Sequence, residues 1–209
     1  MANAGEATGS ASIFESKPQP HIAPIYHRYI QPGQVSQPLT SRHKFVFGLS
    51  QLRSPYLLLT VATAAGYEHL VNGSPNYGTD SAAYGQRVGA AAIRDGSQTL
   101  FSDSIMASLL HEDPRYYIMG NRQSMVVRGG YAVSRVFVTR SDDGRNVPNY
   151  ALLSGYAGAA ALTNAYYPAP NQGASETFKS FAGSLAGVAI SNSVREFLPD
   201  LLQAAHLRK

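Results

Sequence analysis

One dense group of titratable side chains stands near the middle of the chain, at His111-Glu112-Asp113. A histidine beside two carboxylates is a combination that can bind a metal ion or carry out acid–base chemistry. Adjacent residues on a helix point to different faces, however, so these three cannot ligate one metal unless the helix unwinds. The simpler interpretation is the C-terminal end of a helix with a solvated acidic patch, in which Arg115 is the ion-pair partner.

An enzyme is nevertheless an alternative, with a site assembled from Asp103, His111 and Asp113 across a turn. The sequence contains no Gly-x-Ser-x-Gly elbow, no phosphate-binding Gly-Lys-Ser/Thr loop and no His-Glu-x-x-His pair. The chain has no cysteine, which excludes disulfides, thiolate metal sites and cysteine nucleophiles. The sequence therefore favours a protein that is not an enzyme, and it predicts no metal and no cofactor.

The elements that surround this group are predicted to be helices that pack through small side chains. Small residues recur every four positions, which places them on one helix face and lets another backbone come close. The residues expected to form such seams are Ser81, Gly85, Gly89, Ser154, Gly158, Gly183, Gly187 and Ser191. On this interpretation a larger side chain at Gly89 pushes a neighbouring helix away.

The predicted fold class is therefore all-α: a Gly/Ala-rich bundle of about five to six helices. Thr40 and Ser54 are expected as N-caps of the first two helices, with Pro55 in the first turn of the second. Further helices are expected over 81–113, 150–166 and from Ser175 onward. Pro114 stops the central helix, Asp95-Gly96 kinks or breaks it, and Pro199 ends or bends the last one.

Residues 125–147 allow two interpretations. Met125 to Thr139 fits a helix, which we favour. The run Val136–Arg140, followed by Asp142-Asp143-Gly144, equally fits a strand and a turn.

The chain divides into a Pro-rich segment, residues 1–39, and a helical domain, residues 40–209. Five prolines and few apolar residues predict that the first segment is disordered or extended. Its first residues have neither a charged region nor an apolar core, so we expect no signal peptide in this sequence.

The composition favours a membrane boundary over a highly charged surface. Charged residues make up only 14% of the chain, against roughly 25% in typical soluble domains. The net charge is +4, and the basic residues are spread out, so nucleic acid is not an expected partner. Basic and apolar residues near both ends could lie on an acidic membrane surface, namely Arg42, Lys44, Phe45, Arg53, Arg208 and Lys209.

A series of motifs resembles a family of uncharacterised bacterial proteins. The series runs through Asp113-Pro-Arg-Tyr-Tyr117, Thr139-Arg-Ser-Asp-Asp-Gly-Arg145, Asn149-Tyr150, Tyr166-Tyr-Pro168 and Glu196-Phe-Leu-Pro-Asp200. The resemblance covers roughly residues 38–203. It implies soil bacteria and the cell envelope, and it implies no activity and no catalytic residue.

Together these features predict a non-enzymatic protein of the membrane or cell envelope that associates with itself through its small-residue seams. A homo-oligomer is the expected assembly, with membrane lipid as a second partner. One alternative is a soluble helical bundle whose Gly/Ala faces line a cavity for an apolar, lipid-like ligand. The other is the enzyme described above.

Overall fold

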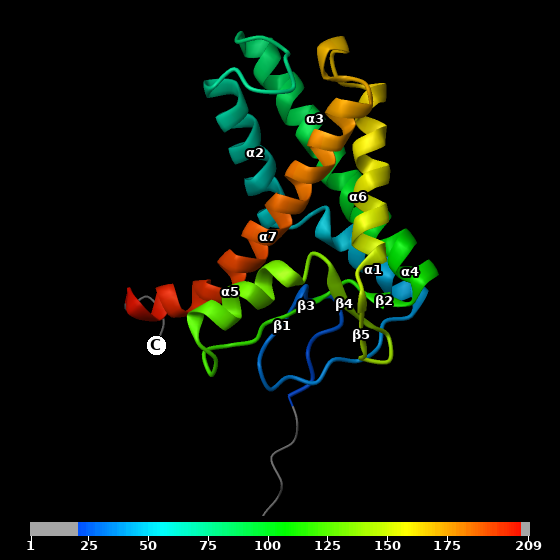
Figure 1. Ribbon diagram of the computed structural model, residues 1–209, viewed down its shortest axis with the longest axis vertical. Helices are drawn as coiled ribbons and strands as arrows, with labels where there is room; N and C mark the ends of the chain where they lie inside the picture. Colours follow the sequence, from blue (N-terminus) through cyan, green and yellow to red (C-terminus); the bar gives the residue numbers. More distant parts are fainter. Residues whose placement is uncertain (1–20, 206–209) are drawn as a thin grey trace, which may run out of the picture.

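The protein is mostly helical, as the sequence predicts; the computed structural model describes residues 21–205 (Figure 1). Long helices form its upper part in this view, and the short strands lie below them, next to the shorter helices. The α-helices are α1 (Ser41–Gln51), α2 (Pro55–Leu70), α3 (Ser81–Thr99), α4 (Ala107–Leu110), α5 (Met125–Ser134), α6 (Tyr150–Leu162) and α7 (Ala174–Ala204). Two 3₁₀ turns, Thr163–Ala165 and Ala169–Asn171, connect α6 to α7.

The predicted N-caps begin the first two helices. Thr40 accepts a hydrogen bond from the His43 amide, and Ser54 accepts one from the Leu57 amide. Asp80 caps α3 in the same way, and each cap satisfies an amide that has no partner within the helix. At α7 the prediction is wrong by two residues, because Gly173 and not Ser175 precedes the first turn. Pro199 does not end α7, which continues to Ala204.

A π-helical segment, η1 (Leu100–Met106), joins α3 to α4. The expected break at Asp95-Gly96 does not occur, and the irregularity lies one turn later. Two glycines hold η1 in place. A Cβ at Gly155 of α6 would lie 2.6 Å from the Ser102 Cα, and a Cβ at Gly48 of α1 would collide with the Ser104 side chain. Backbones can approach this closely only where no side chain intervenes.

Two small sheets are additions that the all-α prediction did not contain. Strand β1 (Tyr29–Ile30) pairs in parallel with β3 (Tyr116–Tyr117). Strand β4 (Val138–Ser141) lies between β2 (Glu112–Asp113) and β5 (Asn146–Pro148), antiparallel to both. The two interpretations of residues 125–147 are therefore each right for one part, with a helix to Ser134 and a hairpin from Val138.

The described part of the Pro-rich segment lies along the protein's own surface. Ile22 and Val35 form a bridge that closes a loop, and β1 joins this segment to the rest of the chain. The segment packs Ala23, Ile30 and Leu39 into the interior. Residues 1–20 lie outside the described residues, as do Arg208 and Lys209.

Most of the predicted seam positions are not places where helices of this molecule touch. A Cβ at Gly85, Gly89, Gly183 or Gly187 would meet nothing within 4 Å. Of the predicted positions, Gly158 contacts the Phe101 ring and Ser191 bonds to Tyr56, while Ser154 bonds back to its own helix. The close approach of α6 occurs at Gly155, one residue after the predicted Ser154. The spacing of small residues alone does not distinguish a contact face from an open one.

Candidate functional site: a polar cavity between the helices

A cavity of about 690 Å³ lies between α2, α3, α6 and α7. This volume is within the range of small-molecule sites. Its upper end is next to the 71–80 loop, and its lower end is next to β3 and β4. Along α7 it extends from Glu176 to Asn192, which is about 24 Å at 1.5 Å per residue. The long dimension of the cavity therefore follows the helix axis.

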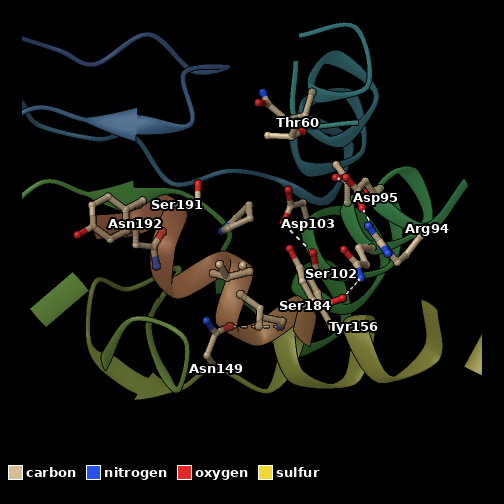
Figure 2. Close-up of a pocket in the computed structure, with 18 of the residues that line it drawn as sticks. Thr60, Arg94, Asp95, Ser102, Asp103, Asn149, Tyr156, Ser184, Ser191 and Asn192 are labelled. Atoms are coloured by element: carbon tan, nitrogen blue, oxygen red, sulfur yellow. Dashed lines mark hydrogen bonds and ion pairs between the residues drawn. The ribbon is translucent and has the colours of Figure 1, made fainter. Parts of the chain in front are cut away.

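Polar and charged side chains point into the cavity from every helix around it (Figure 2). In the upper half, Arg94 of α3 contacts Asp95 at 3.2 Å and Glu68 of α2 at 3.9 Å. Below them, Gln98 donates to the Ser184 hydroxyl of α7 at 2.6 Å. The contact with Glu68 joins α3 to α2, and the hydrogen bond from Gln98 joins α3 to α7.

In the middle of the cavity, the buried Asp103 forms an ion pair with the half-buried Arg28, which comes from the Pro-rich segment. Ser102 donates a second hydrogen bond to this carboxylate at 2.9 Å. Burial raises the pKa of Asp103, and the charge of Arg28 opposes that shift. The pKa of Tyr156, which faces the same pair, is also raised because its phenol is buried. The π-helical turn thus places a charged pair inside the protein.

Arg195 lies one turn beyond the cavity-lining Ser191 on α7. Its guanidinium sits 4.5 Å from the Tyr29 ring centroid and 4.2 Å from that of Tyr56. Such stacking holds a guanidinium in place, while its N–H groups point outward in the plane of the guanidinium.

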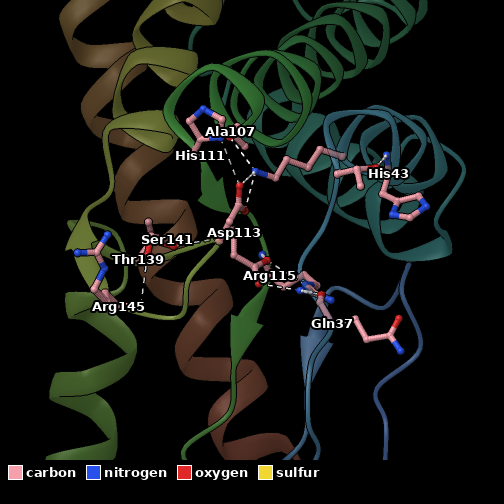
Figure 3. A network of polar contacts seen from close by, with 12 residues as sticks. Gln37, His43, Ala107, His111, Asp113, Arg115, Thr139, Ser141 and Arg145 are labelled. Carbon is pink, nitrogen blue, oxygen red and sulfur yellow. Dashed lines mark hydrogen bonds and ion pairs between the residues drawn. The ribbon is translucent and has the colours of Figure 1, made fainter.

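The residues of the predicted enzymatic site come together only in part. Asp103 and Asp113 line the same cavity, whereas His111 does not. Figure 3 shows His111 and Asp113 within a network of polar contacts. Asp103 is paired with Arg28, and the His111 side chain is 82% exposed beside Asp142. Asp113 is bound on two sides by Arg115, with N–O distances of 2.9 and 2.8 Å. Within residues 21–205 no group of three or more His, Asp and Glu side chains could hold a metal ion.

The predicted ion pair between Arg115 and its acidic neighbour is present, but the acidic patch is not solvated. Glu112 is 4% exposed and Asp113 is 6% exposed. His111 ends the helix in a left-handed conformation, and the next two residues form β2 inside the protein. Glu112 accepts a hydrogen bond from the Ala151 amide in the first turn of α6, so this carboxylate caps a helix.

The membrane-surface candidates divide into two groups. Arg42, Phe45 and Arg53 are exposed on α1 or directly after it. Lys44 was predicted wrongly, because its side chain is 1% exposed and lies 2.7 Å from the Asp142 carboxylate. Its ammonium also donates to the Ala107 carbonyl. The neighbouring arginine and phenylalanine gave no signal that this one basic residue points inward.

Several cavity residues were missed from the sequence. Arg28 lies in a segment with no periodicity, so only the tertiary contact of that segment reveals it. Arg94 and Asp95 could have been predicted to point toward a polar site. The neighbouring side chains on this helix are mostly small and apolar, and charged side chains avoid an apolar environment. Arg135 and Arg140 also line the cavity, at its lower end.

Comparison with known protein families, with curated proteins and with solved structures finds no match for this chain. In the described part of the chain, no helix combines the length and the apolar character needed to cross a membrane.

Proposed function

We propose that this protein is a non-enzymatic, membrane-associated helical protein of the cell envelope, which associates with itself through small-residue helix faces. The observation that supports the proposal best is the distribution of polarity over the upper helices. Charged side chains point inward to the cavity, and apolar side chains point outward.

Helix α2 has the clearest outward face. Leu58, Leu59, Tyr67 and Leu70 are 64%, 62%, 68% and 86% exposed, and at 100° per residue they fall on one half of the helix. Glu68, the carboxylate of this helix, lies on the other half and lines the cavity. Single exposed apolar residues are ordinary, whereas a continuous apolar face marks an interaction surface.

Helices α7 and α3 continue this pattern. Phe178 and Ile190 on α7 are 67% and 65% exposed, and Ile93 on α3 is 50% exposed. Arg94 and Asp95, which directly follow Ile93, turn inward with side chains 18% and 20% exposed. Charges that face a polar interior and apolar groups that face outward are the arrangement that proteins adopt against lipid.

Helix α1 supports the same surface. Phe45, Val46 and Leu49 are 52%, 39% and 43% exposed, and Arg42 and Arg53 are exposed at its two ends. An apolar face flanked by basic residues is typical of a helix that lies in the head-group region.

Self-association is the second part of the proposal. Gly85 and Gly89 lie on an exposed face of α3, where added Cβ atoms would meet nothing of this chain. A second copy can therefore approach this backbone closely, as small-residue faces allow. On this proposal, the small-residue packing predicted from the sequence forms between helices of two copies of the protein.

Vesicle flotation tests the membrane proposal. We expect the protein to float with vesicles that contain acidic lipid, both at 0.15 M and at about 1 M NaCl, because burial of apolar side chains is not screened by salt. Leu58→Ser with Leu59→Ser should lower the bound fraction about tenfold or more, since each buried leucine contributes roughly 1.5–3 kcal/mol.

The matched control is Val126→Ser with Val127→Ser on α5, which removes two exposed apolar side chains far from α2. This control should float like the wild type. Full recovery of the wild type in the lipid-free fraction at low salt would contradict the proposal and would favour the soluble, ligand-binding alternative, for which the cavity provides the space.

A further inference from the structure

Two arginines at the lower end of the cavity have no carboxylate partner. Arg140 of β4 lies 3.9 Å from the Tyr117 ring centroid, and Arg135 lies 4.7 Å from that of Tyr131. Arg140 makes no side-chain hydrogen bond or ion pair with any other residue of the described chain. Within the described residues the Arg135 side chain makes one hydrogen bond, from its Nη1 to Asn146 at 3.3 Å, and this bond lies at the surface.

The two tyrosines on which these arginines stack are joined by a hydrogen bond. The Tyr131 hydroxyl donates to the Tyr117 backbone carbonyl at 2.7 Å. Tyr117, Tyr131, Arg135 and Arg140 all line the same end of the cavity. Burial raises the pKa of the Tyr131 phenol, and the charges of both arginines oppose that shift.

The nearby carboxylate is already fully engaged. Asp113 accepts two hydrogen bonds from the Arg115 guanidinium and a third from the Tyr117 hydroxyl at 2.6 Å. The Nε of Arg135 is buried with no acceptor in the part of the chain that the structure describes. A buried donor without a partner costs about 1–3 kcal/mol, so such donors normally face a ligand, an ion or water.

We propose that this end of the cavity is a phosphate-binding site, in which Arg135 and Arg140 donate to the oxygens of a phosphate group. Guanidinium groups present several N–H donors in one plane, and that fork matches the oxygens of phosphate. Two positive charges balance the charge of −1.5 to −2 that a phosphate monoester carries near neutral pH. Stacking on Tyr117 and Tyr131 fixes both guanidiniums before the anion arrives, which lowers the cost of ordering them.

The site does not depend on the membrane proposal, because the phosphate can belong to a free small molecule or to a lipid head group. Inorganic phosphate and vesicles of phosphatidic acid in phosphatidylcholine are therefore separate probes. Binding of inorganic phosphate is measured by titration calorimetry at constant ionic strength, with chloride as the reference anion. Binding of vesicles is measured by flotation against pure phosphatidylcholine.

The test variant is Arg135→Gln with Arg140→Gln, and the matched control is Arg122→Gln with Arg145→Gln. The control removes the same net charge from two exposed arginines outside the cavity. We expect the test variant to weaken phosphate binding by about tenfold or more, since hydrogen bonds to charged groups contribute about 1.5–3 kcal/mol each. The control should bind like the wild type.

Binding of inorganic phosphate that is lost in the test variant supports a soluble phosphate ligand. A response confined to phosphatidic acid vesicles, and lost in the same variant, supports a lipid head group. The proposal is overturned if the wild type responds to neither probe, or if the control loses as much binding as the test variant. If the test variant does not fold, Arg140→Lys replaces it, and phosphate binding unchanged by this loss of the planar fork would likewise overturn the site.

Discussion

At the scale of single residues, the buried carboxylates of this protein hold elements together. Glu196 of α7 is fully buried and accepts hydrogen bonds from the Met119 and Gly120 amides, the Tyr116 hydroxyl and Arg128. Glu112 similarly fixes the first turn of α6 to β2. Both belong to motifs that the sequence singled out, and both have a structural role that accounts for them.

The pH dependence of stability should show the effect of Glu112. Burial raises its pKa, while hydrogen bonds from the Ala151 and Tyr150 amides oppose the shift. The folded state therefore takes up a proton at a higher pH than the unfolded chain, whose glutamate pKa is about 4.3. It follows that Glu112 adds to the free energy of unfolding as the pH falls from 7 toward that value.

Denaturant unfolding at several pH values measures this effect as a difference between variants. The wild type should gain stability relative to Glu112→Gln as the pH is lowered, because the glutamine cannot take up a proton. Near pH 7 the Glu112→Gln protein should lose little free energy of unfolding, because the side-chain oxygen of glutamine can still accept a hydrogen bond from the first turn of α6. Glu112→Ala should cost about 0.5–2 kcal/mol, the usual loss when a helix cap is removed. A wild type that loses stability relative to the glutamine variant on acidification would contradict the assignment.

At the scale of elements, the π-helical segment η1 organises the centre of the molecule. It carries Asp103 into the cavity, and it is held between α1 and α6 at Gly48 and Gly155. π-helical turns often occur at functional sites, and here the turn places the only residue of the predicted enzymatic site that reaches the middle of the cavity.

Two glycine substitutions should have opposite effects. Gly155→Ala places a Cβ 2.6 Å from the Ser102 backbone and should destabilise the protein by about 1–3 kcal/mol, the range for overpacking. Gly89→Ala meets open space within the chain and should stabilise α3 by up to about 1 kcal/mol through helix propensity. Thermal melts of the two variants at the same low concentration make the comparison. Equal effects of the two substitutions would show that η1 is not held by Gly155.

Much of the helical arrangement was predictable from local signals. Thr40, Ser54 and the turn at Asp142-Asp143-Gly144 act through nearby backbone groups, so their sequence neighbourhood suffices. The π-helical turn and the β1–β3 pair depend on contacts between distant segments. No local sequence pattern predicts these contacts. The same holds for the cavity and for the buried Lys44, since Arg28 of the cavity and Lys44 both look like surface residues until the fold turns them inward.

At the scale of the whole molecule, the central feature is a polar cavity enclosed by helices with apolar outer faces. The inward charges are paired with one another: Arg94 with its neighbour Asp95, and Arg28 with Asp103. The apolar side chains on the outward face of α2 are exposed and are not covered by other residues of the described chain. The membrane association that we propose would account both for the inward charges and for the outward apolar side chains.

The measurement that tests this account most directly uses tryptophan as a reporter, because the chain has none. Leu59→Trp places the reporter on the outward face of α2, and Arg145→Trp places it on the hairpin between β4 and β5, where the side chain is 78% exposed. With vesicles that contain brominated acyl chains, the account predicts strong quenching and a blue-shifted emission for Leu59→Trp. Arg145→Trp should show neither. A blue shift without quenching at Leu59→Trp, or quenching no stronger than at Arg145→Trp, would contradict the claim that this face lies against lipid.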